Sequence, residues 1–227
     1  MNILDLFFPR FCLECKKKGK YICAECLSKM SDAKQICPVC KRYNFGGKTH
    51  DRCASKNNLD GLVTFWNYEG VVRKAILALK YRFAYSVAEE LVASLNLDIR
   101  LDDNVILLPV PLHIKRENWR GFNQATVLGK LLADKQNWQV ENNLLLRLEN
   151  TIPQVKLDRE ERLQNISGKF ALNDEAKRVI LSEAEGSQPV FIIFDDVWTT
   201  GSTISEAGRM LKIAGAKSVW GMSLTRS

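Results

Sequence analysis

The strongest candidate for chemistry is a segment in which two adjacent acids precede a turn rich in hydroxyl groups. Asp195 and Asp196 follow the apolar run 190–194. The residues of the turn are Thr199, Thr200, Gly201, Ser202 and Thr203. Hydroxyls and free N–H groups at the start of a helix bind phosphate, and a glycine lets the backbone approach closely. With carboxylates beside it, such a turn suits a phosphorylated sugar, the alternative being an ordinary helix cap after a solvated turn.

The second candidate is a set of metal ligands in the first quarter of the chain. All seven cysteines lie there, in pairs separated by two residues, and a histidine completes a fourth pair. The eight residues are Cys12, Cys15, Cys23, Cys26, Cys37, Cys40, His50 and Cys53. A two-residue gap lets both side chains of a pair point at one ion, and zinc takes four S or N ligands tetrahedrally. Eight ligands are enough for two structural Zn2+ sites.

The grouping of these pairs is open between two arrangements. Sequential grouping, which we favour, gives one site from the two pairs in residues 12–26 and another from the two pairs in residues 37–53. Interleaved grouping joins the first pair to the third and the second to the fourth. Disulfides need an oxidising compartment, a redox dithiol needs one pair rather than four, and the spacing suits zinc knuckles better than an iron–sulfur cluster.

Charge and cysteine content divide the chain near residue 56. The net charge of +7 lies wholly in residues 1–56, which hold 12 basic and 5 acidic side chains, whereas the remainder holds 21 of each. We therefore expect a cysteine-rich zinc-binding module over 1–56 and a second domain over 57–227. With 46% hydrophobic residues the chain is not a disordered one. It contains no apolar run long enough to span a membrane, and its start is a poor secretory signal, so we expect a cytoplasmic protein.

The excess basic residues could serve solubility or contact phosphate backbones, and the sequence does not decide between these roles. They are Lys16, Lys17, Lys18, Lys20, Lys41, Arg42, Lys48 and Arg52. Tyr21, Tyr43 and Phe45 lie among them, and Trp119 lies between Arg116 and Arg120. Such aromatic rings can stack on bases of single-stranded nucleic acid, but packing in the core explains each of them equally well.

The elements that must position the acids alternate between strands and helices. Strands are expected at 62–68, 105–111, 144–148, 190–194 and 218–224, and helices at 71–81, 84–95, 122–136 and 202–214. This alternation predicts an α/β fold with a mainly parallel sheet flanked by helices on both faces. Ligands of such sheets bind at the carboxyl ends of the strands, where the two acids would lie. Residues 150–168 are polar and show no periodicity.

The segment 191–203 resembles the phosphoribosyl-diphosphate (PRPP) signature of type I phosphoribosyltransferases. Three further segments resemble the ComF (competence protein) family. They are Tyr68-Glu69-Gly70 with Arg73 and Leu79-Lys80-Tyr81; Pro109-Val110-Pro111-Leu112-His113 with Arg116 and Arg120-Gly121-Phe122-Asn123-Gln124-Ala125; and Gln154, Arg159, Arg162, Asn165, Gly168 and Phe170. Together with the cysteine pairs, the resemblance covers nearly the whole chain. His50 departs from the pattern, because it replaces the first cysteine of the fourth pair.

The resemblance implies a type I phosphoribosyltransferase-like domain behind a zinc-ribbon-like module. Asp195 and Asp196 would face the ribose hydroxyls, directly or through Mg2+, and would act in catalysis. The turn 199–203 would hold the 5′-phosphate, while Arg116 and Arg120 would lie near the diphosphate. The segment that contains Gln154 and Arg162 would close over the site. The sequence identifies no acceptor and no general base.

Three functions follow from the resemblance. The first is a ComF-like protein that binds PRPP with Mg2+ and handles incoming single-stranded DNA during natural transformation, with a DNA-uptake helicase or channel protein as partner. The second is an active phosphoribosyltransferase, a glycosyltransferase of the pentosyl class, with an unknown acceptor. The third is a zinc-dependent interaction module on an inactive scaffold.

Overall fold

A five-stranded parallel sheet forms the centre of the computed structural model, which describes residues 9–82, 85–96, 104–148, 168–181 and 188–227. The strand order is β1-β7-β6-β2-β3, and every neighbouring pair is parallel. The strands are β1 (Gly61–Asn67), β2 (Val105–Pro109), β3 (Gln139–Val140), β6 (Val190–Trp198) and β7 (Ser218–Arg226). The predicted parallel α/β fold is confirmed.

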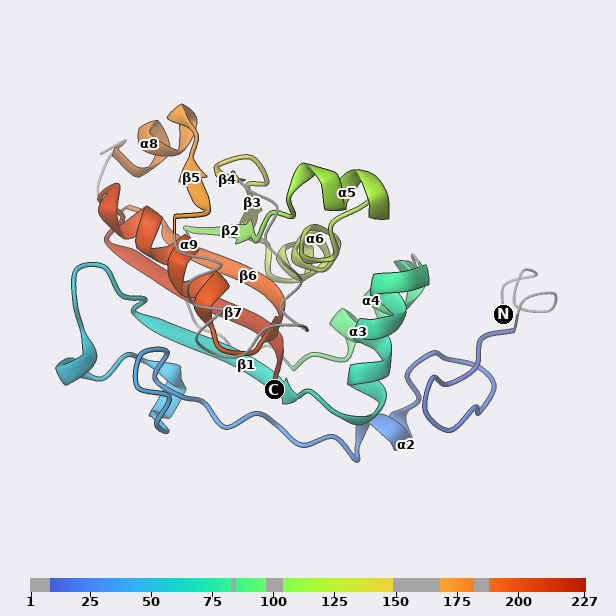
Figure 1. Ribbon diagram of the computed structural model, residues 1–227. Coiled ribbons are helices and arrows are strands. Elements are labelled where there is room, and N and C mark those ends of the chain that lie inside the picture. The colour runs from blue at the N-terminus through green and yellow to red at the C-terminus, as the bar shows by residue number, and fades with distance from the viewer. Residues whose placement is uncertain (1–8, 83–84, 97–103, 149–167, 182–187) are drawn as a thin grey trace.

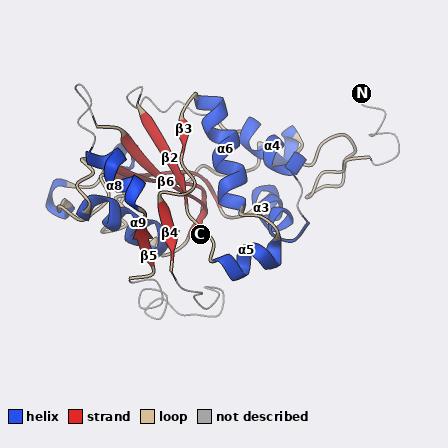
Figure 2. Cartoon of the chain, turned by 90° about the horizontal axis from the view of Figure 1, so that it is seen from above, coloured by secondary structure: helices blue, strands red, loops and turns tan. Residues whose placement is uncertain are grey.

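Helices cover both faces of this sheet (Figure 2). One face packs against α3 (Gly70–Arg82), α4 (Tyr85–Ala93) and α6 (Gln124–Gln136), and the other packs against α8 (Asp174–Leu181) and α9 (Ser202–Ile213). Between these layers the residues of β6 from Phe191 to Phe194 are fully buried. A strand covered on both faces must be apolar on both sides, which explains the continuous apolar run in the sequence.

Strand β6 continues four residues beyond its predicted end at Phe194. Asp195 pairs with Ser223, and Trp198 pairs with Arg226, so β7 holds the extended backbone through both acids. The apolar run alone marked the strand in the sequence, and the two charges marked its expected end. Pairing with a neighbouring strand depends on the backbone, however, and it extends the strand to the start of the turn.

Some elements were not predicted from the sequence. Helix α5 (Ile114–Arg120) has no apolar stripe, because Ile114 and Trp119 are both exposed. Helix α8 is short, and an Asn173 side chain that accepts a hydrogen bond from the Ala176 N–H marks its start. A second, antiparallel sheet pairs β4 (Leu145–Arg147), which falls within the predicted strand 144–148, with β5 (Phe170–Leu172), which was not predicted. None of the described helices has the length and apolar character required to cross a membrane.

The first quarter of the chain runs along the β1 edge of the sheet (Figure 1). Its described residues, from Pro9 on, form the short helices α2 (Ala24–Leu27), η1 (Phe45–Gly47) and η2 (Asp51–Cys53). Backbone hydrogen bonds join Ala33 N–H to the Phe65 carbonyl and Asn67 N–H to the Ser31 carbonyl, so this segment covers the open edge of β1. The boundary at residue 56 stays a prediction, because Cys12, Ile22 and Cys26 lie in the same core cluster as α3 and α4.

Candidate functional site

The two acids lie at the carboxyl end of β6, and a lysine that is distant in sequence neutralises one of them. Lys80, near the end of α3, places its Nζ 3.0 Å from Oδ2 of Asp196. The Asp196 side chain is 12% exposed and that of Lys80 27% exposed, so the ion pair is largely withdrawn from water. The carboxylate raises the pKa of Lys80 against the opposing effect of burial, which keeps the ammonium charged.

Asp195 has no ion pair of its own within the described part of the chain. Burial, followed by repulsion from Asp196, raises the pKa of Asp195 to about 8. Its Oδ1 accepts a hydrogen bond of 2.9 Å from the Asp196 N–H. With this pKa, Asp195 keeps its proton near neutral pH, so the pair carries one negative charge opposite Lys80. A ligand that brings a cation would displace this proton.

The turn after β6 is built around Gly201, the N-cap of α9. Its φ of 81° lies in the left-handed region, and a Cβ there would lie 2.0 Å from Cζ2 of Trp198. Only glycine therefore fits against that ring. The Thr200 and Ser202 hydroxyls are 2.9 Å apart. The residues predicted to form the phosphate turn thus come together at the N-terminus of α9, where the helix dipole favours an anion.

The loop after β2 begins beside these acids. The Val110 N–H donates to the Phe194 carbonyl at 2.8 Å, and the Asn123 amide donates to the Val110 carbonyl at 2.9 Å. Gln124 follows Asn123 and accepts a hydrogen bond from Arg120. This chain of contacts connects Arg120 to the carboxyl end of β2, the strand adjacent to β6.

Two buried donors at the facing ends of α5 and α6 have no hydrogen-bond partner among the described residues. They are Nε of Arg120 and Nε2 of Gln124. Buried donors are nearly always paired, so an orphaned group needs an explanation such as a ligand that is absent. Arg116 lies on α5, and its side chain is outside the described part of the structure. His113 caps α5, its Nδ1 accepting from the Lys115 N–H at 3.2 Å, which is a structural role.

The polar segment predicted to close over the site falls mostly outside the described residues, including Gln154 and Arg162. Its two flanks are brought together by the β4-β5 pair, and the Leu148 N–H donates to the Lys169 carbonyl. The Gly168 N–H donates to Oε1 of Glu206 on α9 at 2.8 Å. The described residues on the two sides of this segment therefore lie next to each other. The flank that begins at Gly168 is attached to α9, the helix that follows the phosphate turn.

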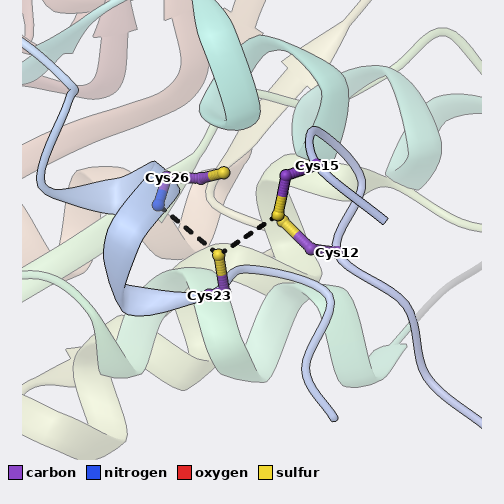
Figure 3. A group of neighbouring side chains, drawn as sticks. All are labelled: Cys12, Cys15, Cys23 and Cys26. Atoms are coloured by element: carbon purple, nitrogen blue, oxygen red, sulfur yellow. Dashed lines mark hydrogen bonds between the residues drawn. The ribbon is translucent and has the colours of Figure 1, made fainter. Parts of the chain in front are cut away.

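The cysteines group sequentially, as we favoured. Cys12, Cys15, Cys23 and Cys26 form one cluster, and Cys37, Cys40, His50 and Cys53 form another. In the first, the Sγ atoms of Cys15 and Cys23 are 3.7 Å apart, and the Cys26 N–H donates to the Cys23 sulfur at 3.4 Å (Figure 3). Zinc–sulfur bonds of about 2.3 Å at tetrahedral angles require an S···S distance of about 3.8 Å. The first cluster therefore fits Zn2+.

The second cluster fits a zinc ion as well, with His50 as the fourth ligand. Nδ1 of His50 lies 3.3 Å from the Cys40 sulfur. A tetrahedral site with one nitrogen ligand requires about 3.5 Å between these atoms. The histidine thus takes the place of a cysteine without disturbing the site.

The pKa values of the thiols agree with this assignment. Burial raises the pKa of Cys12, but hydrogen bonds from the backbone of Cys23 and Cys15 outweigh it and lower the pKa to about 6. Burial likewise raises the pKa of Cys37, but backbone hydrogen bonds from Cys40 and His50 lower it to about 6. Burial and the neighbouring cysteines raise the pKa of Cys26 to about 12. Each cluster therefore holds one thiolate near neutral pH, and a bound cation would favour the deprotonated form of Cys26.

Residues 3–54 match the double zinc ribbon domain. We call residues 9–27 the first ribbon and residues 37–53 the second ribbon. Zinc is thus supported both by the cluster geometry and by the match.

The similarity extends far beyond the ribbons. The chain is 26% identical over 223 residues to Competence protein F of Haemophilus influenzae, covering 93% of this chain and 89% of that protein. It is 28% identical over 226 residues to Competence protein ComFC of Bacillus subtilis, covering 93% and 86%. It is also 28% identical over 222 residues to DNA utilization protein YhgH of Escherichia coli (strain K12), covering 91% and 90%. The predicted resemblance to ComF proteins is confirmed.

Lys80 is a site residue whose role the sequence reasoning missed. In the sequence, Lys80 is marked only as part of a segment that resembles the ComF family. The spacing of apolar residues in α3 contained a further signal. The apolar positions of α3 include Ile76, and Lys80 follows it by four residues, which places a lysine on the buried face of the helix. A lysine in that position needs a buried acid as partner, and Asp196 provides it.

Proposed function

We propose that this protein acts in DNA uptake and that it binds PRPP with Mg2+ at the carboxyl edge of its sheet. Two of its relatives are named competence proteins, which supports the first part of the proposal. The proposal rests on the meeting of three groups at that edge: the acid pair, the glycine turn, and the orphaned donors of Arg120 and Gln124. A sugar with a phosphate at one end and a diphosphate at the other would use all three.

Each group has a distinct part in binding. The backbone and hydroxyls of 199–203 hold the 5′-phosphate, and Asp195 and Asp196 accept hydrogen bonds from the ribose hydroxyls. Arg120 donates to the diphosphate, since a guanidinium matches phosphate oxygens in geometry. Mg2+, when bound, neutralises diphosphate charge and would be held with the help of these carboxylates. If transfer to an acceptor occurs, the two acids favour the positive charge that develops on the ribose ring.

The PRPP proposal is tested by protection against thermal unfolding. A ligand that binds only the folded state raises the unfolding temperature in proportion to ln(1 + [L]/Kd). We expect PRPP with Mg2+ to stabilise the native protein, and the Asp195→Asn/Asp196→Asn variant to show no such shift. A variant that remains folded and is protected as strongly as the native protein would rule out these acids as ligands.

The DNA part of the proposal concerns the exposed aromatic side chains of the second ribbon. Tyr43 is 65% and Phe45 85% exposed, and Lys41 and Arg42 precede them. Neither ring contributes to the core, which removes the packing explanation that the sequence had left open. Aromatic rings next to cations form the kind of surface on which bases of a single strand stack. Relatives with names in competence and DNA utilization fit such a ligand.

Replacing both Tyr43 and Phe45 with alanine should weaken binding of single-stranded DNA by about 30-fold or more, because each stacked base contributes about 1–3 kcal/mol. The measurement is fluorescence anisotropy of a labelled oligothymidine at several salt concentrations. Tyr85→Ala serves as control, since that ring is 48% exposed on α4, outside the ribbon. Equal affinity of the double variant and the control would show that the ribbon aromatics bind no DNA.

A further inference from the structure

A cavity of about 310 Å3 separates the second ribbon from the phosphate turn. Ten residues line it, drawn from three parts of the chain that are remote in sequence. They are Pro38, Val39 and Lys41 from the knuckle of the second ribbon, Asn57, Asn58 and Leu59 from the segment before β1, and Thr200, Gly201, Ser202 and Ser205 from the turn and α9. The second ribbon is therefore one wall of a space whose opposite wall is the candidate phosphate site.

Lys41 occupies a position in this cavity that the metal knuckle fixes. Its φ of 62° is left-handed, an uncommon conformation for a residue with a side chain. The turn is closed by hydrogen bonds from the Lys41 N–H to the Cys37 carbonyl at 3.0 Å and from the Cys37 N–H to the Arg42 carbonyl at 2.9 Å. Cys37 and Cys40 are ligands of the second cluster, so metal binding and the placement of Lys41 depend on the same turn.

The Lys41 ammonium contacts the residue on which the phosphate turn rests. Its Nζ lies 4.3 Å from the centre of the Trp198 ring and also donates to the Pro38 carbonyl. Trp198 is buried, and Gly201 packs directly against the same ring. One indole therefore links the cation of the ribbon to the glycine of the turn.

The chemistry of the lining suits an anion. Among the described residues that line the cavity, Lys41 is the one cation and none is acidic. Asn58, in the segment before β1, is oriented by the second ribbon, its amide donating to the Cys53 carbonyl at 2.9 Å. Thr200, Ser202 and Ser205, which all carry hydroxyl groups, line the opposite wall of the cavity. An ammonium opposite a row of hydroxyls supplies donors from both sides, as a phosphate group requires.

We propose that the second zinc ribbon completes the phosphate site, with Lys41 as a binding residue for the phosphate monoester held by the 199–203 turn. Zinc at the second cluster therefore sets the affinity for that phosphate, whereas zinc at the first does not. The inference rests on the proposed role of the turn as a phosphate site. The phosphate is that of a ribose 5-phosphate or the 5′-terminal phosphate of a DNA strand, two sources with the same chemistry.

The first experiment measures calorimetric affinities of the zinc-loaded native protein and its Lys41→Gln variant. The probes are PRPP with Mg2+, ribose 5-phosphate, and a short oligonucleotide with or without a 5′-phosphate. We expect Lys41→Gln to weaken the binding of the phosphorylated probes by about 10- to 100-fold, which is the effect of losing a charged hydrogen bond. Lys34→Gln, which removes an equal charge from an exposed site outside the cavity, should bind like the native protein.

The results separate this inference from the proposed function. If the native protein binds PRPP and Lys41→Gln binds it equally well, the inference is wrong and the proposed function stands. If PRPP does not bind, but the 5′-phosphorylated oligonucleotide binds in a manner that depends on Lys41, the PRPP function is wrong and the inference stands. Loss of affinity for every probe alike, with or without phosphate, would also overturn the inference.

A second experiment tests the dependence on zinc with a matched pair of variants. Cys40→Ser removes a ligand from the second cluster, and Cys15→Ser removes one from the first. Metal analysis and circular dichroism establish that each variant has lost one zinc ion and kept its fold. We expect about tenfold weaker binding of ribose 5-phosphate for Cys40→Ser alone. Equal affinities for the two variants would contradict the coupling.

Discussion

Removing zinc with a chelator should lower the unfolding temperature of the whole chain by more than about 10 °C, because a structural zinc ion contributes about 10–16 kcal/mol in small zinc domains. The effect should reach beyond the ribbons, since Cys12 and Cys26 are buried in the core cluster that contains α3 and α4. Two ion pairs reinforce this contact: Arg10 with Glu90 at 3.2 Å and Lys74 with Glu14 at 3.0 Å. The measurement is thermal unfolding followed by circular dichroism, before and after zinc is restored.

The histidine ligand provides the control for this prediction. His50→Cys keeps four ligands at the second cluster and should bind two zinc ions per chain, whereas His50→Ala should bind one. His50→Ala should also unfold at a lower temperature than His50→Cys. A metal-free protein, verified by elemental analysis, that unfolds at the temperature of the loaded protein would show that bound zinc contributes nothing to stability.

Replacing Lys80 with methionine should destabilise the protein by about 2–3 kcal/mol, because it leaves the Asp196 carboxylate unpaired where little water reaches it. The double variant Lys80→Met/Asp196→Asn should recover most of this loss, since the unpaired charge is then removed as well. The measurement is the free energy of unfolding in urea at pH 7 with zinc present.

Lys74→Met is the matched control for Lys80→Met, because it removes a lysine of the same helix from an exposed ion pair. The side chains of Lys74 and Glu14 are 44% and 37% exposed, so its loss should cost less than about 1 kcal/mol. Two results would show that the ion pair does not support the site. One is a Lys80→Met variant at least as stable as Lys74→Met, and the other is a further loss of stability when Asp196→Asn is added to Lys80→Met.

The sequence was a good guide where a single segment contained the whole signal. The apolar run of β6 and the two-residue cysteine gaps each predicted a structure, and the alternation of elements predicted the parallel sheet. It failed where the signal came from elsewhere in the chain. Strand β6 extends to Trp198 because β7 pairs with it, and α5 is set by its caps, His113 and Gly121, rather than by an apolar stripe.

The candidate site shows the same division. The turn 199–203 and the acids before it are contiguous, so the sequence contained them in full. Lys80 lies 116 residues from Asp196 in the chain, and Lys41 lies 157 residues from Trp198. Each of these contacts exists only after the sheet has brought remote segments together, and no spacing rule applies over such separations. The aromatic residues of the second ribbon remained ambiguous for a related reason, since only the fold reveals that Tyr43 and Phe45 are exposed.

The central claim is that the carboxyl edge of the sheet binds a ribose with phosphate groups, and calorimetric titration with PRPP tests it most directly. The zinc-loaded native protein would be titrated in the presence and in the absence of Mg2+. The account predicts saturable binding of one PRPP per chain that is strengthened by Mg2+. The absence of any binding heat, from a protein that is folded and contains both zinc ions, would contradict it.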